Sequence, residues 1–221
     1  STPKPSSAAS DVYKRQDQDV AKDFRITVEE LQDQLRIARQ KLMAVRTKRI
    51  RPLLDNKVLT SWNALMISAF ARAARVFGDS SFEKTAERAA VFIFKNLKAE
   101  SGRLLRRWCD REARYPAYLC DYAQMTIACL DLYETTYDPV WFRKGCELSN
   151  EIKRFFRNEN GPFYDTGTDG EVLLTRNAEG YDGVEPSGNS SVANAFLRLN
   201  TYGLESEFFE DAQRIFLCFC P

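Results

Sequence analysis

The chain has 221 residues, 44% of them hydrophobic and 29% charged, an ordinary balance for a globular protein with one sizeable core. Its 32 Lys and Arg nearly balance its 31 Asp and Glu, so we expect no nucleic-acid and no membrane partner. The sequence contains no histidine, which removes the most common general base and the usual zinc ligand. We therefore expect no metal and no cofactor, and any acid–base chemistry must use Asp, Glu, Tyr, Lys or Cys.

No apolar run approaches the roughly 20 residues that a membrane-spanning helix needs, and the start of the chain lacks the apolar segment of a signal peptide. These observations predict a cytoplasmic protein, or one of an organelle matrix in a eukaryote. None of the six cysteines forms a C-x-x-C motif. Cys120, Cys129 and Cys146 fall within helical patterns, where buried, reduced thiols are expected.

Both ends of the sequence look unusual. Residues 1–16, "STPKPSSAASDVYKRQ", lack hydrophobic periodicity and are predicted to be disordered. Within them, "SSAASDVYKRQ" resembles a translated sequencing adapter, so we treat the segment as non-native and leave it out of the fold. The other end, "FLCFCP", stops inside an apolar, helix-like run. We therefore expect the chain to be a fragment with a truncated C-terminus.

A lead-in helix precedes the main domain. Apolar residues three and four apart predict a helix from Val28 to Arg46, and Thr27 with Glu30 forms a capping box at its start. Pro52 interrupts the pattern that follows. We therefore expect a lead-in helix and linker over residues 17–52 and one domain over residues 53–221.

That domain is predicted to be an internal repeat of helix pairs. Phe82, Trp141 and Phe208 occupy matching places in three amphipathic helices and lie 59 and 67 residues apart. Each of these helices follows a more uniformly apolar one, and an extended segment follows the first two pairs, at residues 102–108 and 161–167. The pattern predicts an all-α array of αα-hairpins in which the first helix of each pair is buried and the second lies outside. The expected first helices span 59–77, 121–138 and 187–203, and the expected second helices span 81–97, 139–156 and 206–216.

A polar cluster marks the N-terminus of each expected inner helix, at residues 55–63, 121–122 and 181–190. Helices that recur in order within an array point the same way, so these N-termini should converge at one end. Free backbone N–H groups, carboxylates, amides and aromatic rings would then surround a pocket. A structural interpretation stays open for most of these residues. Helix capping alone would explain Asp121 and Ser187, and core packing would explain Trp62 and Tyr122. Turn formation alone would explain Gly183 and Gly188, and pairing with each other would explain Asp55 and Lys57.

The chain also resembles a known family over about residues 18–212. The resemblance rests on "RQKLMAVRTKRIRPLLDNKVLTSWNALMISAFARAARV", "GRLLRR", "YLCDYAQ" and "YDGVEPSGNSSVANAFLRL". These stretches are similar to the thioredoxin-domain-containing, spermatogenesis-associated protein 20 family. The resemblance implies an upstream thioredoxin-like domain, missing from this chain, followed by an (α/α)6 toroid of the six-hairpin glycosidase type. Three hairpins would form about half of that toroid.

The resemblance also implies which residues carry function. The matching motif positions are Asp55, Asn56, Lys57, Thr60, Trp62, Asn63, Asp121, Tyr122, Asp182, Gly183, Pro186, Ser187, Gly188 and Asn189. This sequence departs from the family pattern at Asn56 and Cys120, where acidic residues are common, and at Ala64, where Gly is common. The sugar 2-epimerases with the same fold rely on histidine, which is absent here. The loss of up to two carboxylates, at positions 56 and 120, and the absence of histidine weaken a prediction of acid–base catalysis.

Three functions remain open from the sequence. The first is a sugar-processing toroid like an epimerase or glycosidase, whose candidate catalytic acids are Asp55, Asp121, Asp182 and Glu185. Asp55 and Asp121 could stand at the roughly 5 to 10 Å that two hydrolytic carboxylates need. The expected residues for binding a sugar or another small molecule are Asn56, Lys57, Thr60, Trp62, Asn63, Tyr122, Ser187 and Asn189. The second function is a non-catalytic binding or scaffold domain serving the upstream thioredoxin-like domain, and the third is a purely structural array.

Overall fold

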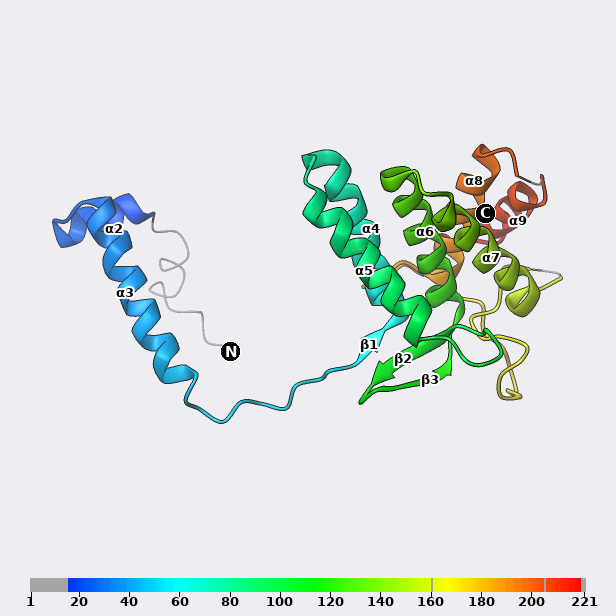
Figure 1. Cartoon of the computed structure of the whole chain (residues 1–221), viewed down its shortest axis with the longest axis horizontal. Helices are drawn as coiled ribbons and strands as arrows, with labels where there is room; N and C mark the ends of the chain where they lie inside the picture. Colours follow the sequence, from blue (N-terminus) through cyan, green and yellow to red (C-terminus); the bar gives the residue numbers. More distant parts are fainter. Residues whose placement is uncertain (1–15, 160, 205, 220–221) are drawn as a thin grey trace, which may run out of the picture. The chain divides into compact units, whose positions relative to one another are not determined.

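The structure is a computed structural model that describes residues 16–159, 161–204 and 206–219. The chain divides into two compact units, residues 1–55 and 56–221, which are described separately below (Figure 1). The predicted disordered, non-native segment 1–16 lies outside the described residues except for Gln16.

The described part of the first unit consists of two helices, α2 (Asp17–Phe24) and α3 (Val28–Arg46). The predicted bounds of α3 and its capping box are confirmed. The Thr27 side chain accepts a hydrogen bond from the Glu30 backbone at 3.1 Å, and the Glu30 side chain accepts one from the Thr27 backbone at 2.9 Å. Residues 49–54 after α3 are exposed and form no helix or strand.

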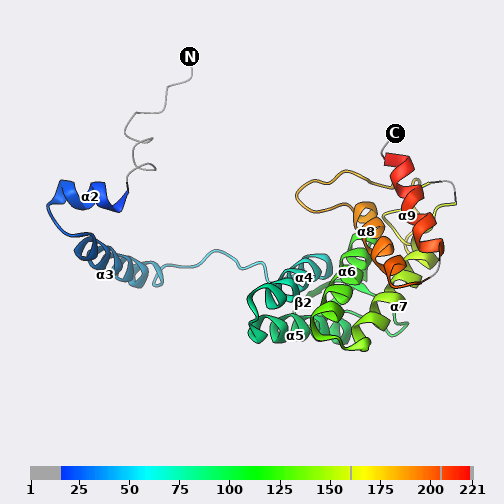
Figure 2. The same cartoon turned by 90° about the horizontal axis from the view of Figure 1, so that it is seen from above.

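The second unit contains three helix pairs, as the repeat predicted. Each inner helix packs on its outer partner and on the next inner helix, so the three inner helices follow one another with their partners outside (Figure 2). The inner helices are α4 (Thr60–Phe77), α6 (Leu119–Thr136) and α8 (Gly188–Thr201). The outer helices are α5 (Ser80–Asn96), α7 (Pro139–Phe156) and α9 (Ser206–Phe219).

The core is centred on α6, which is buried on nearly all sides because α4, α7 and α8 surround it. Its apolar side chains include Met125, Cys129 and Leu132, all fully buried. The outer helix α7 instead buries one face, with Trp141 and Phe156 near its two ends. This difference confirms the prediction that the uniformly apolar helix is the inner one.

A small antiparallel sheet covers the N-terminal ends of α4 and α6. Its strand order is β1 (Val58–Leu59), β2 (Leu105–Cys109) and β3 (Glu112–Pro116). β1 runs directly into α4, and β3 ends three residues before α6. Asp110 and Arg111 have φ values of 50° and 63°, as a two-residue hairpin of the primed type requires. The extended segment predicted at 102–108 therefore overlaps β2, whereas no strand forms at 161–167.

The three inner helices run parallel with their N-termini at one end. Ser61, in the first turn of α4, bonds Asp121 in the first turn of α6. One turn farther along, Gln124 of α6 donates to Ser191 of α8 at 2.7 Å. The predicted convergence of the inner-helix N-termini is thus present.

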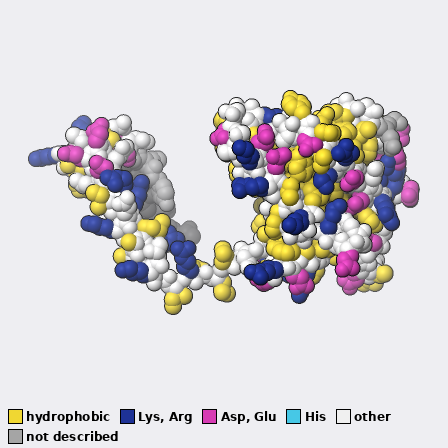
Figure 3. Space-filling view, viewed as in Figure 1, with side chains coloured by type: hydrophobic (Ala, Val, Ile, Leu, Met, Phe, Trp, Pro, Cys, Tyr) yellow, Lys and Arg dark blue, Asp and Glu magenta, His cyan; other side chains and the backbone are white. Residues whose placement is uncertain are grey.

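The surface of the second unit is mixed in charge. On the face seen in Figure 3, Lys and Arg side chains alternate with Asp and Glu among apolar patches, and neither sign forms a continuous field. No helix within the described residues is long and apolar enough to cross a membrane. The five cysteines that the structure describes are all free, and Cys129 is fully buried.

Candidate functional site

Asp121 joins the starts of two inner helices. Its fully buried carboxylate accepts hydrogen bonds from the backbone N–H groups of Ser61 at 3.0 Å and Tyr118 at 2.9 Å. Arg106 of β2 completes the arrangement with an ion pair at 3.1 Å. Burial raises the pKa of Asp121, although Arg106 and the two backbone donors act in the opposite direction. The carboxylate is therefore occupied by structural bonds and is closed to solvent.

Tyr122 lies in the core rather than on a pocket wall, which corrects the expectation that its ring stacks on a substrate. The side chain is fully buried, and its ring centroid lies 5.4 Å from that of Phe156 on α7. Its hydroxyl accepts a hydrogen bond from the Leu104 backbone at 3.0 Å, and the Arg103 guanidinium lies 4.8 Å from the ring centroid. Tyr122 points outward to α7, so it cannot face a ligand held between inner helices.

The polar residues around the start of α4 bond mostly to neighbouring backbone. Thr60 donates its hydroxyl to the Leu105 carbonyl at 2.7 Å, which ties α4 to β2. Asn63 donates to the Leu59 carbonyl at 2.8 Å, within the same helix start. Asn56 donates to Asp110 at 3.3 Å and accepts from the Cys109 thiol at 3.0 Å. These bonds fix the start of α4 to its own backbone and to the sheet.

Asp55 and Lys57 each make interactions with neighbouring groups. Asp55 is the last residue of the first unit, whereas Asp121 belongs to the second. A catalytic pairing of Asp55 with Asp121 therefore stays a prediction.

The third polar cluster fixes the loop before α8. Asp182 accepts from the Ser187 backbone at 2.8 Å, and the Ser187 hydroxyl caps α8 by accepting from the Ser190 backbone at 3.1 Å. The buried Asn189 bonds both backbone groups of Phe163 at 2.9 Å and the Glu179 carbonyl at 3.0 Å. The hydrogen bonds at Ser187 lower the pKa of the exposed Asp182. Ser187 and Asn189 thus organise the backbone of this region.

Trp62 and Glu185 behave differently from these capping residues. The indole Nε1 of Trp62 donates to the Glu185 carboxylate at 2.7 Å, joining the start of α4 to the loop before α8. Trp62 remains 57% exposed. The two side chains hold each other in place while most of the indole surface stays accessible. This pair therefore leaves an aromatic surface of the predicted site open to solvent.

A groove of about 500 Å³ lies between the three inner helices. Its described lining includes Pro186, the neighbour of Glu185, and Leu65, one helical turn after Trp62, but not Trp62 or Glu185 themselves. The buried Gln124 and Ser191 bond each other in its floor. Its other lining residues are Ser68, Ala69, Arg72, Ile127, Ser190 and Asn194. The groove therefore offers hydroxyl, amide and guanidinium groups beside apolar surface, the usual composition of a small-molecule site.

The sequence interpretation missed the functional interest of the inner helices beyond their first turns, including their C-terminal halves. Arg72 and Asp131 lie 59 residues apart, and Asp131 and Arg198 lie 67 apart, the spacing already seen in the outer helices. Extending the repeat beyond the first turn of each inner helix would have placed Arg72 and Asn194 on the face that the three inner helices form together. Among the described residues, no cluster of three or more His, Cys, Asp and Glu could hold a metal.

Comparison with solved structures identifies the fold. The cellobiose 2-epimerase from Spirochaeta thermophila matches with a TM-score of 0.60 at 14% identity, covering 74% of this chain and 43% of that one. The α-mannanase BT2949 from Bacteroides thetaiotaomicron matches with a TM-score of 0.57 at 13% identity, covering 74% of this chain and 41% of that one. An inactive α-1,6-mannanase variant from Salegentibacter, in complex with α-1,6-mannotriose, gives 0.56 at 17% identity, with coverages of 71% and 45%. The fold is thus that of the α/α toroids, and the chain corresponds to somewhat under half of each.

Comparison with curated proteins identifies the family, although no family model matches the chain. An uncharacterised protein of Caenorhabditis elegans is 33% identical over 210 residues, which are 90% of this chain and 28% of that protein. Human spermatogenesis-associated protein 20 is 31% identical over 190 residues, which are 81% of this chain and 24% of that protein. The chain thus spans about a quarter of the length of the curated relatives it matches. Over that quarter, the chain belongs to the spermatogenesis-associated protein 20 family.

Proposed function

We propose that the groove between the inner helices binds a carbohydrate without cleaving it. The observation that carries this proposal is the exposed Trp62 indole, fixed by Glu185 next to two lining residues, Leu65 and Pro186, of a groove of about 500 Å³. An indole offers a flat apolar surface with a polar edge, and it loses little entropy when a ligand packs on it. The hydroxyl and amide groups of Ser68, Ser190 and Asn194 supply the polar partners that sugar hydroxyls need.

The shared fold supports the same ligand class. One toroid of this fold is described in complex with α-1,6-mannotriose, and another is a cellobiose 2-epimerase. Those proteins are 17% and 14% identical to this chain, so the likeness supports the choice of probes rather than a reaction.

The positions of the Asp and Glu side chains do not fit glycoside hydrolysis in this groove. Hydrolysis requires two carboxyl groups on either side of the scissile bond. Among the described residues that line the groove, none is Asp or Glu. Asp121 is fully buried, and Glu185, the neighbour of the lining residue Pro186, is bonded to Trp62. We therefore propose binding rather than turnover.

The test is isothermal titration calorimetry of the chain with α-1,6-mannotriose, cellobiose and a panel of other oligosaccharides. We expect at least one sugar to bind the wild type, and Trp62→Ala to weaken that affinity by about tenfold or more, since a buried aromatic anchor commonly contributes over 1 kcal/mol. Phe77→Ala is the matched control, because Phe77 is an exposed aromatic at the opposite end of the same helix. Binding by no sugar, or equal binding by Trp62→Ala, would refute the proposal.

A second candidate function is a scaffold without a small ligand, serving the upstream thioredoxin-like domain that the family resemblance implies. The observation that favours it is the use of Asp121, Ser187 and Asn189 in bonds to the backbone. The same titration separates the two candidates, because a scaffold predicts no heat with any sugar. It also predicts that Trp62→Ala changes only stability.

A further inference from the structure

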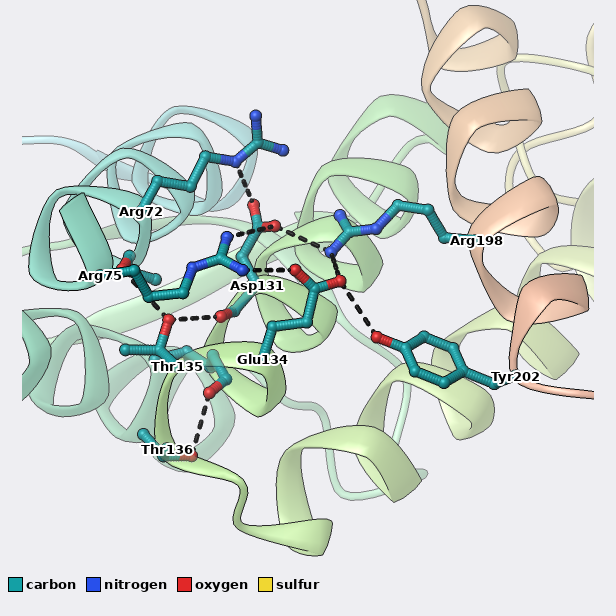
Figure 4. A network of polar contacts seen from close by, with 10 residues as sticks. Arg72, Arg75, Asp131, Glu134, Thr135, Thr136, Arg198 and Tyr202 are labelled. Carbon is teal, nitrogen blue, oxygen red and sulfur yellow. Dashed lines mark hydrogen bonds and ion pairs between the residues drawn. The ribbon is translucent and has the colours of Figure 1, made fainter.

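Three arginines and two carboxylates link the inner helices at the ends opposite their N-termini (Figure 4). Asp131 of α6, whose side chain is 1% exposed, accepts from Arg72 of α4 at 3.0 Å and from Arg198 of α8 at 2.8 Å. Glu134, one turn later on α6, pairs with Arg75 at 2.6 Å and Arg198 at 2.6 Å. The cluster thus connects three consecutive inner helices.

The cluster carries an excess positive charge. Burial alone would raise the pKa of Glu134, but hydrogen bonds from Arg198 and Arg75 outweigh it and lower the pKa, so the carboxylate is ionised at neutral pH. A hollow of about 520 Å³ beside the cluster is lined by these five charged residues and Val76. Three guanidinium groups then face two carboxylates, which leaves one positive charge uncompensated within the lining.

The side chain of Arg72 presents this positive charge to solvent, where a ligand can contact it. Its side chain is 57% exposed, and only its Nε bonds Asp131. Its terminal nitrogens Nη1 and Nη2 donate no hydrogen bond to another described residue, and in Figure 4 they point away from Asp131. Arg72 lines both the hollow and the groove between the inner helices. The other described residues that line the groove are uncharged.

We propose that the ligand of this groove carries an anionic group, a carboxylate or a phosphate, which the terminal nitrogens of Arg72 bind. This inference rests on the proposed function and narrows its ligand class to acidic sugars. The planar guanidinium presents two parallel N–H groups that match a carboxylate or phosphate edge. Asp131 is a positioning residue here, because its bond to Nε fixes the guanidinium and leaves the outer edge free. The uncharged groove between Arg72 and Trp62 would then hold the sugar ring.

The test compares matched neutral and charged sugars by titration calorimetry at one ionic strength. The probes are glucose, mannose and their uronate and 6-phosphate forms. We expect at least one charged form to bind about tenfold to a hundredfold more tightly than its neutral parent, the range for hydrogen bonds to a charged group. The preference should fall as salt is added, because Arg72 is exposed. The form that gains more affinity over its neutral parent, uronate or 6-phosphate, identifies the anionic group.

Three variants test whether Arg72 causes the preference for the charged sugar. Arg72→Gln should abolish it while binding of the neutral sugar persists, and Arg72→Lys should retain only part, because an ammonium lacks the fork. Arg214→Gln is the matched control, since Arg214 also bonds a buried aspartate, Asp211, at 2.8 Å and does not line the groove. It should keep the full preference.

The outcomes separate this inference from the proposed function. Equal binding of neutral and charged sugars, or a preference that survives in a folded Arg72→Gln variant, overturns the inference and leaves carbohydrate binding intact. If Arg72→Gln unfolds, Arg72→Lys decides, and an undiminished preference in it overturns the inference. Binding of none of the sugars by the wild type refutes the proposed function and this inference with it.

Discussion

At the scale of single residues, Asp121 links the start of α4 to the start of α6. It bonds two backbone N–H groups from two different helices and one arginine. The Asp121→Asn substitution keeps one acceptor oxygen but sets an amide N–H group against one of those donors. We predict a loss of about 2 to 4 kcal/mol in the free energy of unfolding, since a buried donor is left without a partner. Urea denaturation measures it.

The control for this prediction is Asp138→Asn at the start of α7. Asp138 is exposed, and its side chain caps the helix by accepting from Val140 at 2.9 Å. Asparagine caps a helix about as well as aspartate, so Asp138→Asn should lose little stability. Equal losses in the two variants would show that Asp121 is an ordinary cap and would contradict its role as a link between α4 and α6.

The contrast between Trp62 and Tyr122 shows the limit of sequence reasoning for single residues. Aligning Trp62 with Tyr122 uses a spacing of 60, whereas Arg72 and Asp131 pair across a spacing of 59. A shift of one residue turns a side chain by about 100° around a helix. Trp62 is therefore exposed beside the groove, whereas Tyr122 points into the core. Helix starts could be predicted from caps and periodicity, but the rotation of each helix depends on packing between distant residues.

At the scale of elements, α8 approaches α6 closely at its first residue. A Cβ added to Gly188 would lie 3.0 Å from Cγ and Cδ2 of Leu119 and 3.2 Å from the Cys120 backbone nitrogen. We predict that Gly188→Ala destabilises the chain by about 1 to 3 kcal/mol, the usual cost of overpacking. Thermal and urea unfolding would measure the change.

Gly145 in α7 provides the matched control. A Cβ there would meet Leu130 and Cys129 at 3.5 and 3.6 Å, which is ordinary contact. Gly145→Ala should be neutral or stabilising by up to about 1 kcal/mol, because alanine favours a helix interior. A Gly188→Ala variant as stable as Gly145→Ala would refute the close approach of α6 and α8.

The pairing of α7 with α9 predicts a pH dependence. Glu207 of α9 binds Lys153 and Arg157, and hydrogen bonds from these two lower its pKa below the ordinary 4.5. Because the folded pKa is the lower one, the ionised form stabilises the fold above about pH 4.5, and this contribution is lost as the pH falls through the folded pKa. Since Glu207 is partly exposed, we expect at most about 1 kcal/mol.

The measurement is the difference in Tm between wild type and Glu207→Gln across the pH range. We expect a constant gap near neutral pH that closes in acid. Glu210→Gln is the control, since Glu210 is exposed on the same helix. A gap that does not change with pH would contradict the assignment.

At the scale of the whole molecule, the repeat of helix pairs was readable in the sequence because the inner and outer helices differ in how far around they are apolar. The boundaries of α7 were predicted correctly, since Asp138 and Pro139 form a distinct start. The strand β3 and the path of residues 161–187 were not predicted. The backbone of residues 161–187 is fixed by side chains such as Asn189, which bonds residues 26 and 10 positions away. Such contacts have no periodic signature in the sequence.

The central claim is that the face formed by the three inner helices binds a carbohydrate beside Trp62. The most direct measurement is a nitrogen–proton correlation spectrum of the chain, in which each of the three tryptophans gives one indole signal. Trp108 lies on β2 and Trp141 is buried on α7, so they serve as internal references. We predict that a bound sugar shifts the Trp62 indole signal in a saturable way and leaves the other two in place. No shift with any sugar, or a shift confined to Trp108 or Trp141, would contradict the account.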